Sequence, residues 1–85
     1  MKNTGKYEDN LNIIGKTLRK IRTEKGISYE KLSNQLLLIG INIPVTSLDR
    51  IENNQRTVRD YELCGIAKIL DINVLDLLNP FIKKL

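Results

Sequence analysis

The sequence contains no histidine and no tryptophan, and it has a single cysteine. Without histidine the chain lacks the commonest metal ligand and general base of proteins. Its acidic residues are scattered, and no glycine-rich phosphate loop is present. Cys64 cannot form an internal disulfide, and it stands beside a predicted buried stripe, which favours core packing over a nucleophilic role. We therefore expect no enzymatic activity, no cofactor and no metal site.

Long apolar runs and aromatic side chains are also scarce. No run approaches the roughly 18 residues of a membrane span, and the opening residues, MKNTGKYEDN, lack the apolar core of a signal peptide. A cytoplasmic protein with no membrane contact is the simplest interpretation. Aromatic residues make up 5% of the chain, so the core must consist of Leu and Ile, and platforms for stacking RNA bases are missing.

The charge of the chain is positive and unevenly distributed. The 85 residues suffice for one domain, and the formal net charge is +4. Residues 1–59 carry eleven Lys and Arg against six Asp and Glu, whereas residues 60–85 carry three against four. A basic first part suits a phosphate-rich partner, but cations also serve simply to keep a small protein soluble. Charge alone leaves both interpretations open.

Apolar residues recur at helical spacing along the chain, and no segment has the pattern of a strand. One stripe is formed by Leu11, Ile14, Leu18 and Ile21. Gly26 then ends this helix, and Ser28 is the expected N-cap of the next. The pattern predicts an all-α fold, a compact bundle of about five short helices at residues 11–25, 29–39, 45–53, 60–70 and 74–79.

The last two helices carry their own boundary signals. Asp60 is the expected N-cap of the fourth helix, and Asn73 begins a cap pattern for the fifth. In the fifth helix we expect Leu75 and Leu78 to face the core and Pro80 to end the helix. The predicted organisation is a flexible tail at 1–9, a domain at 10–79 and a C-terminal tail at 80–85.

The third helix, in VTSLDRIENNQR, is unusually polar for one of few helices in a small domain. Its only apolar anchors are Val45 or its neighbour, Leu48 and Ile51, so it can bury only a thin stripe. The outer face is thus free to contact a partner, unless it is an ordinary solvated helix surface.

Three segments together resemble the Cro- and phage-repressor-type helix-turn-helix domains, also called the xenobiotic-response-element family. They are LRKIRTEKGISYEKLS, TSLDRIENNQR and ELCGIAKILDINVLDLL, and the resemblance covers about residues 12–79. It implies a lambda-repressor-like domain in which the helix at 45–53 lies in the major groove of double-stranded DNA. The base-reading residues would be Val45, Thr46, Ser47, Asp49 and Arg50.

Two of these side chains have more than one possible role. Arg50 could bond guanine edges or a phosphate. Asp49 could accept a bond from a cytosine amino group, or could repel phosphates and so set the register.

The resemblance also implies phosphate contacts and one structural ion pair. Tyr29 stands where relatives often hold a phosphate-binding glutamine, although a half-buried Tyr packing on the first helix is an equally good interpretation. The loop after the reading helix would contact phosphates through Asn54, Gln55, Arg56 and Arg59. Asn54 replaces a glycine that is common in relatives, and it tolerates a left-handed backbone. Arg22 and Glu52 would form a partly buried ion pair.

The segment LLLIGINIP departs from the family because it lengthens the turn between the second and third helices by about five residues. Its apolar side chains, Leu37, Leu38, Ile39 and Ile41, cannot all share one helical stripe. We expect two of them to thicken the core and the others to be exposed, which makes Leu37–Ile43 a candidate surface for a protein partner.

Two functional hypotheses follow. The first is a sequence-specific DNA-binding transcriptional regulator, a repressor acting as a homodimer on a two-fold operator. The alternative is a protein-interaction module on the same fold, antitoxin-like or a phage adaptor, that uses the apolar 37–43 patch. A DNA reader should be positive around the third helix, and its binding should weaken steeply with salt.

Overall fold

The computed structural model describes residues 9–85, so the tail predicted at 1–9 lies almost wholly outside the described residues. The described chain consists of five helices: α1 (Gly15–Glu24), α2 (Tyr29–Leu38), α3 (Val45–Glu52), α4 (Asp60–Leu70) and α5 (Val74–Ile82). The predicted all-α fold is confirmed, and no β-strand occurs between residues 9 and 85. None of these helices is long and apolar enough to cross a membrane.

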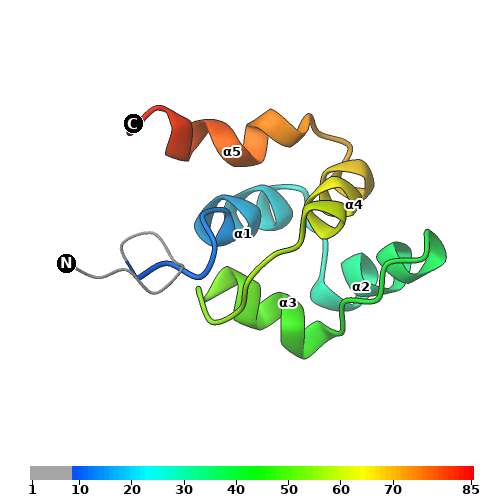
Figure 1. Ribbon diagram of the computed structural model, residues 1–85. Coiled ribbons are helices and arrows are strands. Elements are labelled where there is room, and N and C mark those ends of the chain that lie inside the picture. Colours follow the sequence, from blue (N-terminus) through cyan, green and yellow to red (C-terminus); the bar gives the residue numbers. More distant parts are fainter. Residues whose placement is uncertain (1–8) are drawn as a thin grey trace.

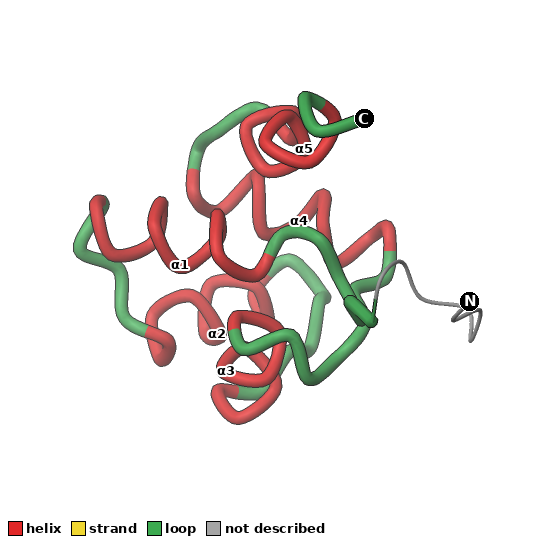
Figure 2. Tube along the Cα trace, turned by 90° about the vertical axis from the view of Figure 1, so that its left-hand side faces the viewer, coloured by secondary structure: helices red, strands yellow, loops and turns green. Residues whose placement is uncertain are grey.

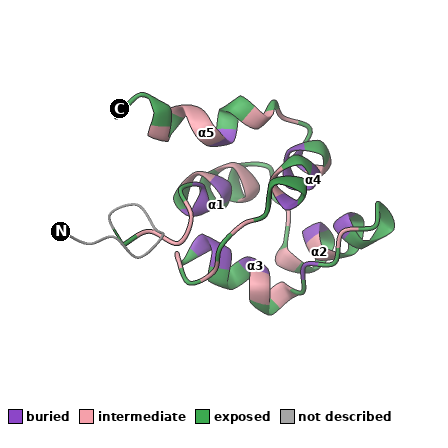
Figure 3. Ribbon diagram, in the orientation of Figure 1, coloured by how far each residue is buried: buried purple, intermediate pink, exposed green. Residues whose placement is uncertain are grey.

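The helices are arranged in three levels (Figures 1 and 2). α5 lies on one side, α1 and α4 lie in the middle, and the pair α2 and α3 lies on the other side. Contacts join α1 to α3 and α5, and α2 to α3 and α4. The inward faces meet in one core, as Figure 3 shows, built from Ile14, Leu18, Leu32, Leu36, Ile43, Leu48, Ile51, Ile66, Ala67, Leu70 and Leu77.

The first helix begins at Gly15, four residues later than predicted. Its start is displaced because the side chain of Asn12 caps it: Asn12 Oδ1 accepts bonds from the backbone N–H of Ile14 at 3.1 Å and of Gly15 at 2.9 Å. Leu11 belongs to the irregular segment before the helix rather than to its stripe. The predicted end is confirmed, because Gly26 follows the helix with a φ of +67°.

The caps of the other helices agree with the sequence in two of three cases. Ser28 Oγ accepts the N–H of Lys31 at 3.1 Å, and Asn73 Oδ1 accepts the N–H of Leu75 at 2.9 Å, so both predicted caps are confirmed. The N-cap of α4 is Arg59, and the prediction of Asp60 was wrong. The carboxylate of Glu62 reaches back to the Arg59 N–H at 2.9 Å, which satisfies the helix end without an Asp cap.

The fifth helix differs from its prediction in two respects. Leu75 does not face the core, since it is 47% exposed; Leu77 is fully buried instead and Leu78 is half-buried. Pro80 does not end the helix, which continues to Ile82. Proline removes only its own N–H donor, and the next turn is closed by the Lys83 N–H on the Asn79 carbonyl at 2.9 Å.

Two glycines allow close approaches between elements. A Cβ at Gly15 would lie 2.5 Å from the carbonyl oxygen of Ile51, so α1 packs directly against the backbone at the end of α3. A Cβ at Gly65 would collide with the side chain of Ile41, which therefore seats the long connector onto α4. Both contacts determine where α3 lies relative to the rest of the domain.

The connector between α2 and α3 is ordered by three bonds. The backbone N–H of Ile41 donates to the Leu36 carbonyl at 3.0 Å, and that of Gly40 donates to the Leu37 carbonyl at 2.9 Å. The hydroxyl of Ser33 donates to the Ile43 carbonyl at 2.7 Å. Ile43 is fully buried two residues before the first residue of α3.

The apolar side chains of the 37–43 segment divide differently from the prediction. Leu37, Leu38 and Ile39 are exposed at 58%, 84% and 40%, and of the four only Ile41 packs against the core, so the expectation that two would be buried was wrong. Ile43, at the end of the segment, is part of the core. Cys64 also departs from expectation, because it is exposed on α4 rather than packed in the core.

Candidate nucleic-acid interface

The helix α3 has one buried and one exposed face. Leu48 and Ile51 are fully buried, as predicted, and Ile43 rather than Val45 is the third anchor. Val45 and Ser47 are half-buried. The solvent-facing side consists of Thr46, Asp49, Arg50 and Asn53; Asp49 and Arg50 lie three and four residues after Thr46, and Asn53 lies four and three residues after them.

Beneath this face lies a buried carboxylate that joins three helices. Glu52 Oε2 accepts Nε of Arg22 at 2.7 Å, and Glu52 Oε1 accepts Nη2 of Arg22 at 3.1 Å, so the predicted ion pair is present and bidentate. The same Oε1 accepts the hydroxyl of Tyr29 at 2.8 Å and Nε of Arg19 at 3.2 Å. The side chain of Glu52 is completely buried and that of Arg22 is 12% exposed. This cluster ties α3 to α1 and α2.

The electrostatics of the cluster favour an ionised Glu52. Burial by itself would raise the pKa of Glu52, but the hydrogen bonds from Arg22, Tyr29 and Arg19 hold that pKa below its ordinary value. Burial and the bond to Glu52 raise the pKa of the Tyr29 hydroxyl, which remains a donor at neutral pH. The guanidinium of Arg22 also lies 4.1 Å from the centroid of the Tyr29 ring. The folded structure thus stabilises the ionised form of Glu52.

The side chain of Tyr29 is therefore part of this cluster. Its hydroxyl donates to Glu52 and lies 3.4 Å from Asp49 Oδ1, and the residue is half-buried. A phosphate could take this hydroxyl only by breaking the bond to the buried carboxylate. The geometry favours the structural interpretation of Tyr29 over the phosphate contact.

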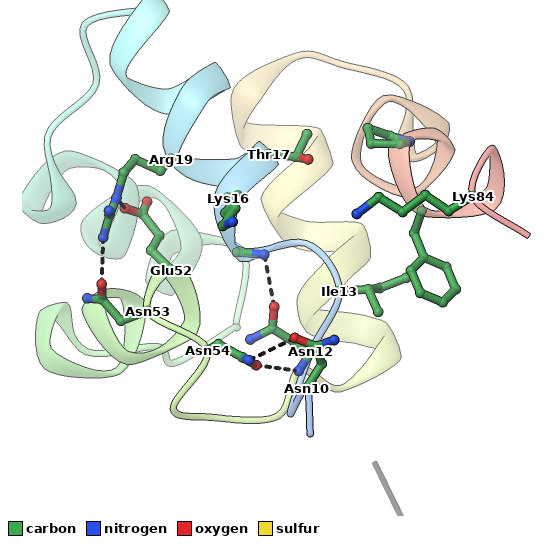
Figure 4. A pocket seen from close by; sticks show the side chains of 13 residues that line it. Asn10, Asn12, Ile13, Lys16, Thr17, Arg19, Glu52, Asn53, Asn54 and Lys84 are labelled. Atoms are coloured by element: carbon green, nitrogen blue, oxygen red, sulfur yellow. Dashed lines mark hydrogen bonds and ion pairs between the residues drawn. The ribbon is translucent and has the colours of Figure 1, made fainter. Parts of the chain in front are cut away.

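Asn54 also has an intramolecular role, and its phosphate contact stays a prediction. Its φ of +59° confirms the expected left-handed backbone. Asn54 Oδ1 accepts the N–H of Leu11 at 2.7 Å and of Asn12 at 3.2 Å, and its Nδ2 donates to Asn10 Oδ1 at 2.9 Å. Figure 4 shows Asn10, Asn12 and Asn54 beside one another. The side chain of Asn12 also donates to the backbone carbonyls of Ile51 and Arg56. These amides fasten the segment before α1 to the end of α3.

Arg56 is held by a second buried carboxylate. Its Nη1 and Nη2 lie 3.0 Å from the two oxygens of Glu62, whose side chain is 2% exposed. Burial would raise the pKa of Glu62, but the bonds from Arg56 and from the Arg59 N–H lower it. Arg56 therefore has a structural contact within the domain, since both Nη atoms of its guanidinium are bonded to Glu62, and the phosphate contact stays a prediction.

The side chains left for an external partner are fewer than the sequence predicted. Arg50 and Gln55 are exposed and form no side-chain bond with any residue from 9 to 85. Arg59 is 64% exposed and touches Glu62 at 3.7 Å. Together with Thr46 and Asp49 they form a polar, positively charged surface along α3 and the loop after it.

Three residues near this surface were missed by sequence reasoning. They are Asn12, Arg19 and Asn53. Arg19 stands one turn before Arg22, so a pair of arginines at a spacing of three was the available signal for a shared carboxylate. Asn53 stands four residues after Asp49, the spacing at which side chains meet on a helix. Nothing in the sequence identified Asn12, whose partners are about forty residues away.

A cleft of about 520 Å³ adjoins the end of α3 (Figure 4). One wall is apolar, with Ile13 and Phe81, and the other carries the cluster around Glu52. Lys16 and Lys84 extend into it from α1 and from the C-terminal end of the chain. The cleft separates α5 from the loop that follows α3.

Comparison with known proteins agrees with this arrangement. Residues 17–81 match the family model described as the Cro/C1-type HTH DNA-binding domain. The fold is similar to that of the restriction-modification controller protein C.AhdI from Aeromonas hydrophila, with a TM-score of 0.68 and 32% sequence identity over 84% of this chain and 98% of that one. No curated protein matches the chain. The chain belongs to the family of Cro/C1-type helix-turn-helix DNA-binding domains, and it is a DNA-binding regulator.

Proposed function

We propose that this protein is a transcriptional repressor that reads a specific DNA sequence in the major groove with α3. The observation that supports this most directly is the division of α3 into a thin buried stripe and a polar outer face. A helix enters the major groove only if its base-reading side chains face away from its own domain. Thr46, Asp49 and Arg50 satisfy that requirement.

We assign the base contacts to side chains along the outer face and at the start of α3. Arg50 is unbonded, exposed and long enough to reach guanine edges. Thr46 and Ser47 provide hydroxyls near the start of the helix, where recognition helices contact bases. Val45 is half-buried outside the core and suits a thymine methyl group.

The phosphate contacts come from Gln55 and Arg59, which flank the reading helix without reading bases. Arg59 keeps most of its surface exposed despite its neighbour Glu62. Tyr29, Asn54 and Arg56 act indirectly, because they hold α3 and its loop in place.

The regulator acts as a homodimer on two half-sites about one helical turn apart. A single α3 of eight residues reads too few bases to specify one site in a genome, and doubling the site multiplies the discrimination. The exposed Leu75, Ile82 and Leu85 on α5 and at the C-terminus form the contact between the two copies. Bound at an operator in the cytoplasm, such a dimer blocks access to the DNA it covers.

A selection of random duplex DNA on the purified protein, repeated at two salt concentrations, tests this function. We expect an enriched palindromic motif, and a binding constant that falls steeply as salt rises. The spacing of the two half-sites in the motif reports the geometry of the dimer. Binding without any enriched motif would contradict sequence-specific reading.

A protein-interaction role remains the second candidate because Leu37, Leu38 and Ile39 are exposed together at the end of α2. Exposed neighbours of this kind are typical of partner surfaces. A variant with Leu37 and Leu38 replaced by Ser distinguishes the two functions. As a DNA regulator the variant selects the same motif as the unmodified protein, whereas an adaptor that needs this patch loses its partner.

A further inference from the structure

The exposed face of α3 is not uniform, because one side of it is already organised by hydrogen bonds. Asn53 Nδ2 donates to Asp49 Oδ1 at 3.1 Å and to the Asp49 carbonyl at 2.9 Å. The hydroxyl of Tyr29 lies 3.4 Å from the same Oδ1. Thr46 and Arg50, on the same face, form no side-chain bond within residues 9–85.

Arg19 determines which way the amide of Asn53 points. Its Nη2 donates to Asn53 Oδ1 at 2.9 Å, and Figure 4 shows this bond beside the contact between Arg19 and Glu52. Because the guanidinium occupies the amide oxygen, the amide nitrogen must face Asp49. A continuous chain of bonds therefore runs from the buried Glu52 through Arg19 and Asn53 to the exposed Asp49.

The bonded Asp49 retains one oxygen for a partner. Its Oδ1 accepts the bond from Asn53 Nδ2 and lies 3.4 Å from the Tyr29 hydroxyl, which donates its proton to Glu52. Its Oδ2 accepts no bond from the described residues. An ionised carboxylate offers only acceptors, so the group that it can read on a base edge is an amino donor. In the major groove a cytosine N4 amino group is the usual donor to Asp.

The charges of the cluster also allow a carboxylate at this place. Asp49 and Glu52 are balanced by Arg19 and Arg22, so the group as a whole is neutral. Without that balance an exposed Asp on a reading helix would mainly repel phosphates.

We infer that Arg19 and Asn53 are positioning residues that orient the Asp49 carboxylate to read a cytosine amino group in the major groove. This inference rests on the proposed function, since it concerns the same helix and the same DNA. Asp49 determines the preference for cytosine at one position. Arg19 and Asn53 determine how strongly cytosine is favoured there, although neither needs to touch DNA.

The test compares position-resolved base preferences in duplex selections with the full chain and four variants: D49A, D49N, N53A and K20A. The unmodified protein should favour cytosine at one position in each half-site. D49A should lower that preference by about tenfold at that position alone. D49N should turn it toward adenine, because an amide bonds adenine N6 and N7.

The decisive variant is N53A, since Asn53 is exposed and its removal leaves the core intact. It should weaken the cytosine preference several-fold while the other positions of the motif and the thermal midpoint stay unchanged. A purely structural Asn53 would change stability and total affinity rather than one base position. K20A removes an exposed cation of α1 outside this chain of bonds, and it should leave every preference unchanged.

The outcomes separate the inference from the function on which it rests. If the unmodified protein selects no motif, both are overturned. If it selects a motif but D49A changes no base preference, Asp49 does not read a base and the inference alone fails. If D49A acts but N53A leaves the cytosine preference intact, the positioning role is wrong.

Discussion

Arg22 Nε lies 2.7 Å from Glu52 Oε2, and this contact joins the last turn of α1 to the last residue of the reading helix α3. Glu52 is thirty positions from Arg22 in the chain, and its carboxylate is wholly buried. The orientation of α3 relative to α1 therefore depends on the buried charge of Glu52.

Replacing Glu52 with Ala should destabilise the protein by about 3–5 kcal/mol, because it leaves the largely buried Arg22 without its partner. Urea unfolding followed by circular dichroism measures the change. Glu24→Ala is the matched control, because it removes an exposed carboxylate at the end of α1 that lies outside this cluster, and it should alter stability by less than about 0.5 kcal/mol. Equal stability of the two variants would show that the Glu52 cluster contributes little.

Stability should fall in acid because the pKa values of Glu52 and Glu62 are both held below their ordinary range. A carboxylate with a lowered pKa in the folded state contributes its full stabilisation above its unfolded pKa of about 4.3. That contribution is lost as the pH falls through the lower folded pKa. Unfolding free energies between neutral pH and strong acid measure this, and Glu62→Gln should show a shallower acid dependence than the unmodified protein.

Arg56→Ala should reduce stability by about 2 kcal/mol, since it breaks a two-pronged pair with a buried Glu62. The slope of DNA binding against salt should change little, because this guanidinium is already bonded within the domain. Arg59→Ala should do the opposite, with stability nearly unchanged and a salt slope smaller by about one. If Arg56→Ala instead lowered the salt slope and left stability unchanged, Arg56 would contact DNA as the sequence predicted.

Gly15→Ala should destabilise the domain by about 1–3 kcal/mol, although Ala is the better helix former. The added Cβ would lie 2.5 Å from the Ile51 carbonyl oxygen and 3.0 Å from that of Glu52, and backbone atoms cannot turn aside. Gly65→Ala is a useful comparison, because there the obstacle is the end of the Ile41 side chain. Thermal unfolding of the two variants should show the larger loss for Gly15; a stabilised Gly15→Ala variant would mean that α1 and α3 are free to separate.

Arg50→Ala should relax the base preference at one position per half-site by about 1–3 kcal/mol while the fold is retained. The side chain is exposed and makes no bond within the described residues, so its removal has no structural cost. Duplex selection measures the effect, and Lys68→Ala on α4 controls for the loss of one positive charge. Unchanged discrimination between sites would exclude Arg50 as a base reader.

Much of the fold followed from local patterns in the chain. The spacing of Leu63, Ile66 and Leu70 placed α4 between its observed ends, and Gly26 and Ser28 marked the turn between α1 and α2. The errors occurred where a distant partner outweighed the local signal. Leu11 lies outside α1, and its N–H donates to the side chain of Asn54. The helix α5 continues past Pro80, because the loss of one backbone donor does not end a helix that is packed against the domain.

The candidate site shows the same division. Exposure of Thr46, Asp49 and Arg50 could be predicted, because helical spacing alone separates them from Leu48 and Ile51. The intramolecular contacts of Tyr29, Asn54 and Arg56 could not be predicted, since each depends on a hydrogen-bond partner on another segment.

By itself, the sequence determined the helices, most of their caps and the polar face of α3, because these depend on side chains within a few positions of one another. Only the tertiary structure decided which polar residues of that region are free to meet DNA. The physical reason is that a buried carboxylate requires partners, and Glu52 and Glu62 take theirs from whichever arginine, tyrosine or backbone N–H the packing brings within reach.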